Sequence, residues 1–388
     1  MFKYMSQKMK VMAIKLEVGI GLQTEVLQVQ DDMDLLRLML DDCKRGPQLY
    51  QPTNYWAVYK GLFLPELLKL GLHDFRRREN SVLSSFGATD LMPRSIDLYA
   101  KPWLNNQYTR KIPVYPWVLK WMNNRFNGFV GNQERYGIAL YDLKKAMYDY
   151  AISLGKKAGA KLPEAFSVSL FGNPEDILEV EGRYYTPSIL SYYLRYVYCC
   201  NFIDFKKVKV MVELGCGSGK QIEVLKKLYP KMSFVLFDIL PQLYVCEQYL
   251  KMVFPGDVVS FRDTREFEKI VPETGKIYIM GTAKFPLIRA MNVDLFWNAA
   301  SFQEMEPEIV LNYLSIVNGC AGHVFLQEKM KGKGVSRVKG RQGVLERTTL
   351  EHYKQGLTNF TLVDISASAQ KIGIMPEYSD SFWRRKKR

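Results

Sequence analysis

Long apolar stretches are missing from this sequence of 388 residues. No run reaches the roughly 18 uninterrupted apolar residues that a membrane-spanning helix needs. The first ten residues include three lysines and lack the apolar core of a secretory signal. We therefore expect a cytoplasmic protein with no transmembrane segment.

Cysteine and histidine are also scarce, with six and three residues respectively. Only Cys199 and Cys200 are adjacent, and no Cys-x-x-Cys or mixed Cys/His grouping occurs. This pattern argues against a disulfide framework and against a zinc site. We expect free thiols and no metal site, although a magnesium-assisted reaction stays open.

Positive charge is abundant, since 54 Lys and Arg face 40 Asp and Glu, a formal net charge of +14. This balance suggests an anionic partner, of which a nucleic acid is only one kind. The basic residues cluster at 76–78, 329–341 and 384–388. We expect residues 381–388 to form a solvated basic tail, with contact to a membrane surface or a polyanion as the alternative.

A glycine-rich turn is the strongest local signal. The segment Glu213-Leu-Gly-Cys-Gly-Ser-Gly219 follows an apolar run at 208–212 and precedes a helical pattern at 220–228. A strand, a glycine turn and a helix open the ligand site of many α/β folds. Glycine permits positive φ and leaves the backbone N–H groups accessible to a ligand.

The spacing of Gly215, Gly217 and Gly219 departs from the dinucleotide fingerprint, in which the third glycine follows the second by three residues. A second strand at 232–238 ends in Asp238, about twenty residues after the turn, where an acid can accept hydrogen bonds from ribose hydroxyls. Together these features indicate a cofactor that contains adenosine.

The word Glu-Leu-Gly-Cys-Gly-Ser-Gly resembles the class I S-adenosylmethionine-dependent methyltransferases. Further segments at 182–187, 238–241, 248–250 and 298–305 are similar to the sugar O-methyltransferase family of bacterial biosynthetic clusters, over about residues 50 to 370. The resemblance implies S-adenosyl-L-methionine as the cofactor. The residues expected to bind it are Glu213, Gly215, Cys216, Gly217, Gly219, Asp238, Ile239 and Asn298. Cys216 and Ser218 stand where relatives often carry glycine, which should alter only the detail of the turn.

The fold class that we predict is α/β, with a doubly wound, mostly parallel sheet. Apolar runs predict strands at 208–212, 232–238, 258–261, 276–280, 294–298, 322–328 and 360–365. Helical periodicity dominates residues 1–200, at 31–42, 63–70, 136–154 and 188–199. We expect 1–200 to be a mainly helical region that covers the acceptor, and 201–380 to be the methyltransferase domain.

Two segments suggest how an acceptor is held. Residues 107–132 are dense in Tyr, Trp, Asn and Arg, which suits a sugar, or else a loop-rich packing surface. From this segment we select Trp121 and Arg125, and from the segment 182–187 we select Tyr185. The basic segment 329–341 leaves the fifth strand and can fold over the acceptor, where Lys331 and Arg337 would hold a diphosphate; a solvated loop is the alternative.

Methyl transfer to a sugar hydroxyl calls for a general base. Glu304 follows the fourth strand at the predicted carboxyl edge, although it can also be a helix-end carboxylate. His352, in a predicted helix, is the second candidate.

The sequence thus predicts an S-adenosylmethionine-dependent O-methyltransferase that acts on a nucleotide-linked sugar or a glycoside. The basic composition also suits RNA, but no Asn-Pro-Pro-Tyr-like word follows the fourth strand, which disfavours nucleic acid and base N-methylation. Another small-molecule acceptor, or a scaffold that binds the cofactor without chemistry, stays open.

Overall fold

The computed structural model describes residues 28–76, 133–174, 177–336, 338–341, 343–369 and 378–387; for 133–143 it describes the backbone alone. Among these residues, no helix combines the length and the apolar character that a bilayer span requires.

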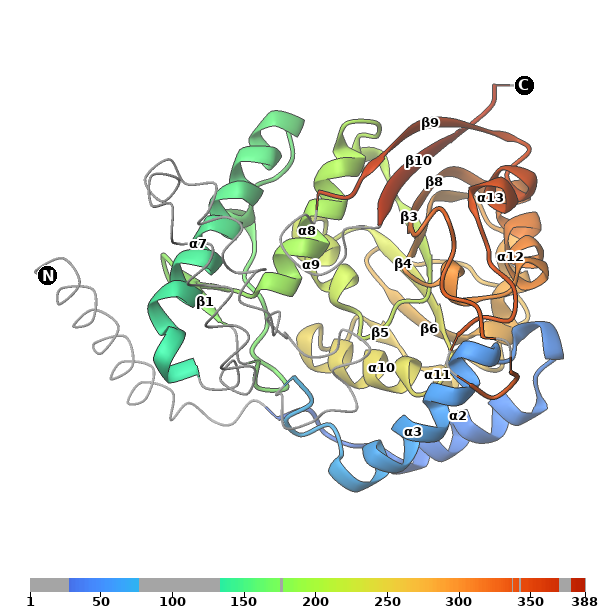
Figure 1. Ribbon diagram of the computed structural model, residues 1–388. Helices are drawn as coiled ribbons and strands as arrows, with labels where there is room; N and C mark the ends of the chain where they lie inside the picture. The colour runs from blue at the N-terminus through green and yellow to red at the C-terminus, as the bar shows by residue number, and fades with distance from the viewer. Residues whose placement is uncertain are drawn as a thin grey trace, which may run out of the picture.

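The centre of the molecule is an eight-stranded sheet in the order β5-β6-β4-β3-β7-β8-β10-β9 (Figure 1). Its strands are β3 (Val210–Leu214), β4 (Ser233–Asp238), β5 (Val258–Val259), β6 (Ile277–Gly281), β7 (Val293–Ala299), β8 (Ala321–Glu328), β9 (Phe360–Ala367) and β10 (Ser379–Arg385). The first six in this order pair in parallel, whereas β10 is antiparallel to both β8 and β9. The prediction of a doubly wound, mostly parallel sheet is confirmed.

Strand β10 corrects the expectation of a solvated basic tail. Ser381, Phe382 and Trp383 are buried, and the strand lies between β8 and β9. The basic side chains that suggested solvation are used as donors: Arg385 donates to the carbonyl oxygens of Ala321 (2.6 Å) and Asn318 (3.0 Å). These carbonyls lie at the end of a helix, where a cation is favourable.

Helices cover both faces of the sheet (Figure 1). One core contains residues of α8 (Pro187–Cys200), α9 (Lys220–Leu228) and α10 (Gln242–Val253); the other contains residues of η4 (Thr282–Ala290), α12 (Pro307–Cys320) and α13 (Leu350–Gly356). Strand β4 shows why both layers form. Phe234 and Leu236 belong to the first core, and Val235 and Phe237 to the second, as the two-residue period of a strand requires.

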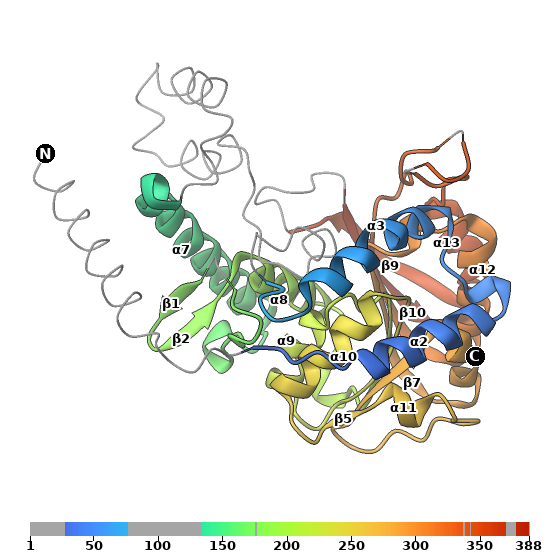
Figure 2. The same ribbon diagram turned by 90° about the horizontal axis from the view of Figure 1, so that it is seen from below.

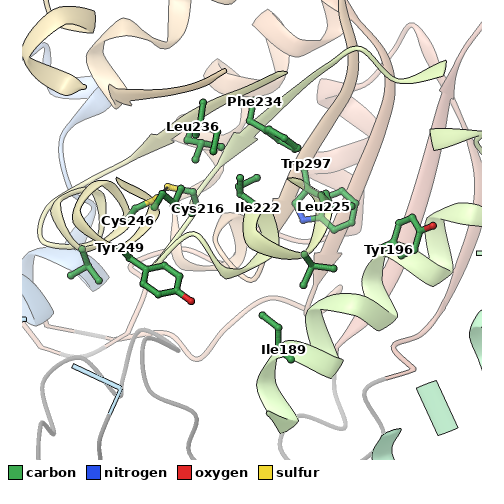
Figure 3. Close-up of a cluster of buried hydrophobic side chains, with 14 of the residues drawn as sticks. Ile189, Tyr196, Cys216, Ile222, Leu225, Phe234, Leu236, Cys246, Tyr249 and Trp297 are labelled. Atoms are coloured by element: carbon green, nitrogen blue, oxygen red, sulfur yellow. Dashed lines mark hydrogen bonds between the residues drawn. The ribbon is translucent and has the colours of Figure 1, made fainter. Parts of the chain in front are cut away.

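Figure 3 shows part of the first core, in which Ile222 and Leu225 of α9 lie between Ile189 of α8 and the strand residues Phe234 and Leu236. This burial seats α9 against the sheet, and therefore places the turn that precedes α9 at the carboxyl end of β3.

The N-terminal region is mainly helical, as predicted. Its elements are α2 (Met33–Arg45), η1 (Gln48–Tyr50), α3 (Asn54–Leu70), α7 (Gln133–Ala158), η2 (Pro163–Ala165) and a hairpin of β1 (Leu178–Val180) and β2 (Arg183–Tyr185). The hairpin was not expected from the sequence. Short connecting elements are η3 (Phe205–Lys207), α11 (Phe261–Thr264) and η5 (Phe302–Glu304).

Helix α2 lies beside α10 and α11 in Figure 2 and is held there by ion pairs. Arg262 binds Asp32 (2.9 Å) and Arg265 binds Asp42 (2.6 Å). Further along, the Thr53 hydroxyl donates to the carbonyl oxygen of Glu304 (2.9 Å). The segment before and within α3 is thereby attached to the loop that follows β7.

Candidate functional site

The glycine turn between β3 and α9 has the predicted conformation. Gly215, Gly217 and Gly219 have φ of 82°, 56° and 81°, which is the left-handed region. A Cβ atom on Gly215 would lie 2.6 Å from the side chain of Ser301, and one on Gly219 would lie 2.9 Å from Leu250. Both conformation and packing therefore require glycine at these two positions.

Asp238 ends β4 beside this turn. Its carboxylate accepts hydrogen bonds from the backbone N–H groups of Gly217 and Ile239, each at 2.7 Å. Burial raises the pKa of Asp238 to about 7, although these two hydrogen bonds favour the ionised form. Since a carboxylate has about four acceptor positions, Asp238 can still accept hydrogen bonds from a ligand hydroxyl.

Glu213 lies at the end of β3 and is only 2% exposed. Its Oε2 atom has no hydrogen-bond partner within the described ranges. Burial raises the pKa of Glu213 to about 8, against the opposing influence of the Arg195 guanidinium. A buried carboxylate that lacks a partner favours a ligand that brings a donor or a positive charge.

Two residues expected to bind the cofactor prove to hold the protein together. The Asn298 amide donates to the carbonyl oxygen of Leu214 (2.7 Å) and accepts from the N–H of Phe302 (3.1 Å), so it joins the ends of β3 and β7. The Cys216 thiol is buried and lies 3.6 Å from that of Cys246 on α10 (Figure 3). Both side chains thus have contacts within the fold, and their part in cofactor binding stays a prediction.

Glu304 ends η5, immediately after β7, and is 8% exposed. Its carboxylate is ion-paired with Lys333, and the nearby side chains of Trp56 and Tyr55 also favour its ionised form. Burial raises the pKa of Glu304, and the ion pair with Lys333 opposes this rise. Its negative charge also contributes to the raised pKa of Asp238.

Tyr55 and Trp56 were missed by reasoning from the sequence. They begin an aromatic cluster on α3 in which the Trp56 and Tyr59 ring centroids are 5.7 Å apart. The only hint in the sequence was the number of aromatic residues in this one helix. Nothing local in the sequence connects them to Glu304, which lies about 250 positions further along the chain.

The basic segment after β8 is attached to α3. Asn54 donates to the carbonyl oxygens of Arg341 (3.1 Å) and Gly343 (2.9 Å), and the Lys333 ammonium lies 3.9 Å from the centre of the Tyr55 ring. Lys331 is exposed. Arg337, the other residue selected in this segment, lies outside the described residues.

His352 lies at the start of α13, where the sequence predicted a helix. Its Nδ1 accepts the backbone N–H of Thr349 (3.1 Å), and the Thr349 side chain accepts the N–H of His352, which is a capping box. The structure thus gives His352 a helix-capping role.

Of Trp121, Arg125 and Tyr185, which were chosen for the acceptor, the structure describes only Tyr185. Tyr185 is fully buried, and its hydroxyl donates to the carbonyl oxygen of Pro163 (3.0 Å). Its ring lies 4.8 Å from that of Tyr148, so it belongs to the core of the N-terminal region, which corrects the expectation. Trp121 and Arg125 lie outside the described residues.

Metal-binding side chains are not grouped here. Over the ranges that the structure covers, no cluster of three or more His, Cys, Asp or Glu could hold a metal ion.

Part of the chain that contains this site matches a known protein family. Residues 156–296 match the sequence model of the O-methyltransferase domain. The chain carries a class I methyltransferase domain. Its cofactor is S-adenosylmethionine. The family match covers the glycine turn and Asp238, and ends before Glu304 and the basic segment.

Solved structures with similarity to the chain include other methyltransferases. The pyocyanin biosynthetic protein PhzM is 14% identical, with 51% of this chain and 56% of that chain covered and a TM-score of 0.35. The mitomycin 7-O-methyltransferase MmcR is 10% identical, with 50% and 57% covered and a TM-score of 0.32. The magnesium protoporphyrin IX methyltransferase of Synechocystis PCC 6803 is 11% identical, with 63% and 99% covered and a TM-score of 0.36.

The chain thus spans little more than half the length of the first two of these proteins. No curated protein matches its sequence.

The residues of the methyltransferase domain fit S-adenosylmethionine. The glycine turn packs closely against Ser301 and Leu250 and ends at the start of α9. Asp238 offers acceptors for hydroxyl groups, and Glu213 offers a buried carboxylate oxygen without a partner to the positively charged end of the cofactor. The domain therefore has the donor and acceptor chemistry that this cofactor requires.

Proposed function

We propose that this protein is an O-methyltransferase that transfers the methyl group of S-adenosylmethionine to a sugar hydroxyl. The observation that carries the proposal is the position of Glu304, a buried carboxylate in η5, which follows β7 at the carboxyl edge of the sheet. The acceptor would be a nucleotide-linked sugar or a glycoside.

Bound S-adenosylmethionine supplies an electrophilic methyl group. Glu304 would accept the proton of the acceptor hydroxyl, which makes that oxygen a better nucleophile. Because burial raises the pKa of Glu304, its carboxylate is a stronger base than an exposed glutamate. Lys333 holds the carboxylate in place through its ion pair, and Tyr55 and Trp56 lie close enough to favour the ionised form.

The aromatic side chains of α3 support a sugar as the acceptor. Trp56 and Tyr59 are half-buried, and both rings pack against Tyr55. An aromatic face offers an apolar surface to the C–H groups of a sugar ring, while the tyrosine hydroxyl and the charged pair offer hydrogen bonds to its hydroxyls. Exposed Lys331 is available to a phosphate group, whereas Lys333 is engaged with Glu304.

The test is transfer of label from S-adenosylmethionine to a panel of nucleotide sugars, free glycosides and RNA. Under the proposal, a sugar is labelled on oxygen, and Glu304→Gln lowers kcat at least about a hundredfold while binding of S-adenosylhomocysteine persists. His352→Asn is the control and should lose no more than its helix cap contributes to stability. Labelling of RNA alone, or a large rate loss only in His352→Asn, would overturn the assignment.

The cofactor site is tested separately by calorimetry. Asp238→Ala should weaken S-adenosylhomocysteine binding by roughly 2 to 4 kcal/mol, because two hydrogen bonds to a charged acceptor are lost. Binding without any labelled acceptor would instead indicate a scaffold that retains the cofactor site without chemistry.

A further inference from the structure

Gln303 is the middle residue of η5, the short helix that ends with Glu304. A 3₁₀-helix of three residues is too short to hold its own position. Neighbouring side chains therefore support its backbone. The N–H of Phe302 donates to the Asn298 side chain (3.1 Å). The N–H of Gln303 donates to Oε2 of Glu328 (3.1 Å). The position of Glu304 thus depends on side chains that lie outside η5.

The side chain of Gln303 is fully buried, and both ends of its amide make hydrogen bonds. Oε1 accepts the backbone N–H of Lys329 (2.8 Å), and Nε2 donates to the hydroxyl oxygen of Tyr378 (2.5 Å). Because a backbone N–H can only donate, Lys329 fixes which end of the amide is the oxygen and turns the NH₂ group toward Tyr378. The amide therefore has a single orientation.

These two partners of Gln303 lie side by side at the carboxyl edge of the sheet. Glu328 ends β8 and pairs with Ser379, which begins β10. Lys329 follows the first and Tyr378 precedes the second, so the antiparallel register places them next to each other. The Lys329 ammonium lies 5.9 Å from the centre of the Tyr378 ring. The Gln303 side chain thus joins the loop after β7 to the ends of β8 and β10.

Both members of the ion pair between Glu304 and Lys333 are connected to this amide. Glu304 directly follows Gln303 in the chain. Lys333 lies four residues after Lys329, whose N–H the Gln303 side chain accepts. The chain turns back between them, since the N–H of Gly332 donates to the carbonyl oxygen of Lys329 (2.7 Å). A displacement of Gln303 would therefore move the carboxylate relative to the ammonium group.

We propose that Gln303 is the positioning residue for the base Glu304, and that the Tyr378 hydroxyl holds the Gln303 amide in the orientation that this role requires. Neither side chain has to touch the acceptor. They hold the carboxylate where it can take the proton of the acceptor hydroxyl, and a displacement of about 1 Å can lower a rate on the order of a hundredfold. An amide suits this role because it adds no charge beside Glu304 and Glu328. This inference rests on the proposed function.

Steady-state kinetics with the nucleotide sugar or glycoside that the panel labels, and calorimetry with S-adenosylhomocysteine, test this role. Gln303→Met keeps the side-chain length but loses both hydrogen bonds. We expect kcat to fall about tenfold to a hundredfold, while the acceptor KM and the affinity for S-adenosylhomocysteine change less than about twofold. Tyr378→Phe removes only the acceptor of the amide N–H and should lower kcat about twofold to tenfold.

Tyr353→Phe is the matched control for Tyr378→Phe. Tyr353 is also buried, but its hydroxyl has no hydrogen-bond partner among the described residues. Loss of this hydroxyl should therefore leave kcat unchanged.

A combination with Glu304→Gln separates positioning from a purely structural role. If Gln303 acts through Glu304, adding Gln303→Met to Glu304→Gln should cause no further loss of kcat, because the group that it positions is already gone. The same fold loss in both backgrounds would make Gln303 structural and overturn the inference. If Gln303→Met does not fold, Tyr378→Phe in the two backgrounds decides by the same comparison.

Failure of this inference differs from failure of the proposed function. If Glu304→Gln lowers kcat but Gln303→Met and Tyr378→Phe retain the wild-type value, the base stands and only the positioning role is wrong. If Glu304→Gln itself retains the wild-type kcat, Glu304 is not the base, and both proposals are overturned.

Discussion

The ammonium group of Lys333 is ion-paired with the carboxylate of Glu304 and lies over the ring of Tyr55. This contact joins three parts of the chain: the loop after β7, the basic segment after β8, and the start of α3. Asp238, Glu328 and Tyr378 also interact with the Glu304 charge. Lys333 is therefore a positive group that favours the ionised form of the proposed base.

Removal of Lys333 should shift the pH dependence of methyl transfer. Lys333 lowers the pKa of Glu304, so in Lys333→Met that pKa rises further. Because a base must be ionised, the acidic limb of the kcat/KM profile should move to higher pH. Lys333→Arg should restore the profile, and Lys339→Met, an exposed change in the same segment, should leave it in place. An unshifted limb in Lys333→Met would contradict the assignment of Glu304 as the base.

Gly215→Ala should destabilise the protein and weaken S-adenosylhomocysteine binding. The new Cβ atom would meet Ser301 at 2.6 Å, and the φ of 82° adds roughly 1 to 2 kcal/mol of backbone strain. Gly256→Ala is the matched control, because its φ of 80° imposes the same strain with nothing within 4 Å. Chemical denaturation and calorimetry should therefore show the larger loss of stability, and the loss of binding, in Gly215→Ala alone.

The stability of the ligand-free protein should decrease as the pH rises. Burial raises the pKa of Glu213 and Glu328 to about 8 and that of Asp238 to about 7, whereas unfolded carboxyl groups titrate near 4. A raised pKa in the folded state means that its stabilising contribution is complete below about pH 4 and is lost as the pH approaches 8.

Each such group can reduce stability by up to about 1.4 kcal/mol per pH unit within that interval. Denaturation from pH 5 to 8 measures how steeply the free energy of unfolding falls with pH. Glu213→Gln should make this slope shallower, because one group that binds a proton in the folded state is removed. If the slope in this variant equals that of the wild type, Glu213 is already ionised in the folded protein at pH 5.

Trp383→Ala should lower the free energy of unfolding by roughly 3 to 5 kcal/mol, because it removes a large side chain from a core. Trp383 is 2% exposed, and its indole N–H donates to Ser381 (3.0 Å). Lys387→Ala, an exposed change four residues later, should have little effect. If both variants were as stable as the wild type, residues 381–388 would be a solvated tail after all.

The sequence by itself determined the parts of this protein whose signals are local. Gly215, Gly217 and Gly219 could be recognised because a tight turn needs positive φ at those residues, and Asp238 because it ends an apolar strand at a set distance from the turn. Buried parallel strands such as β4 are continuous apolar runs, so the sheet was also predictable.

Tertiary structure alone decided the features that depend on distant partners. Strand β10 carries charges whose acceptors, Asn318 and Ala321, lie more than sixty positions earlier, so its sequence resembles a solvated tail. Other contacts also join segments that are far apart in the sequence. Glu304 lies near Tyr55 and Lys333, and Arg195 binds Gln327. Separation along the sequence does not reveal which of these segments meet in the fold.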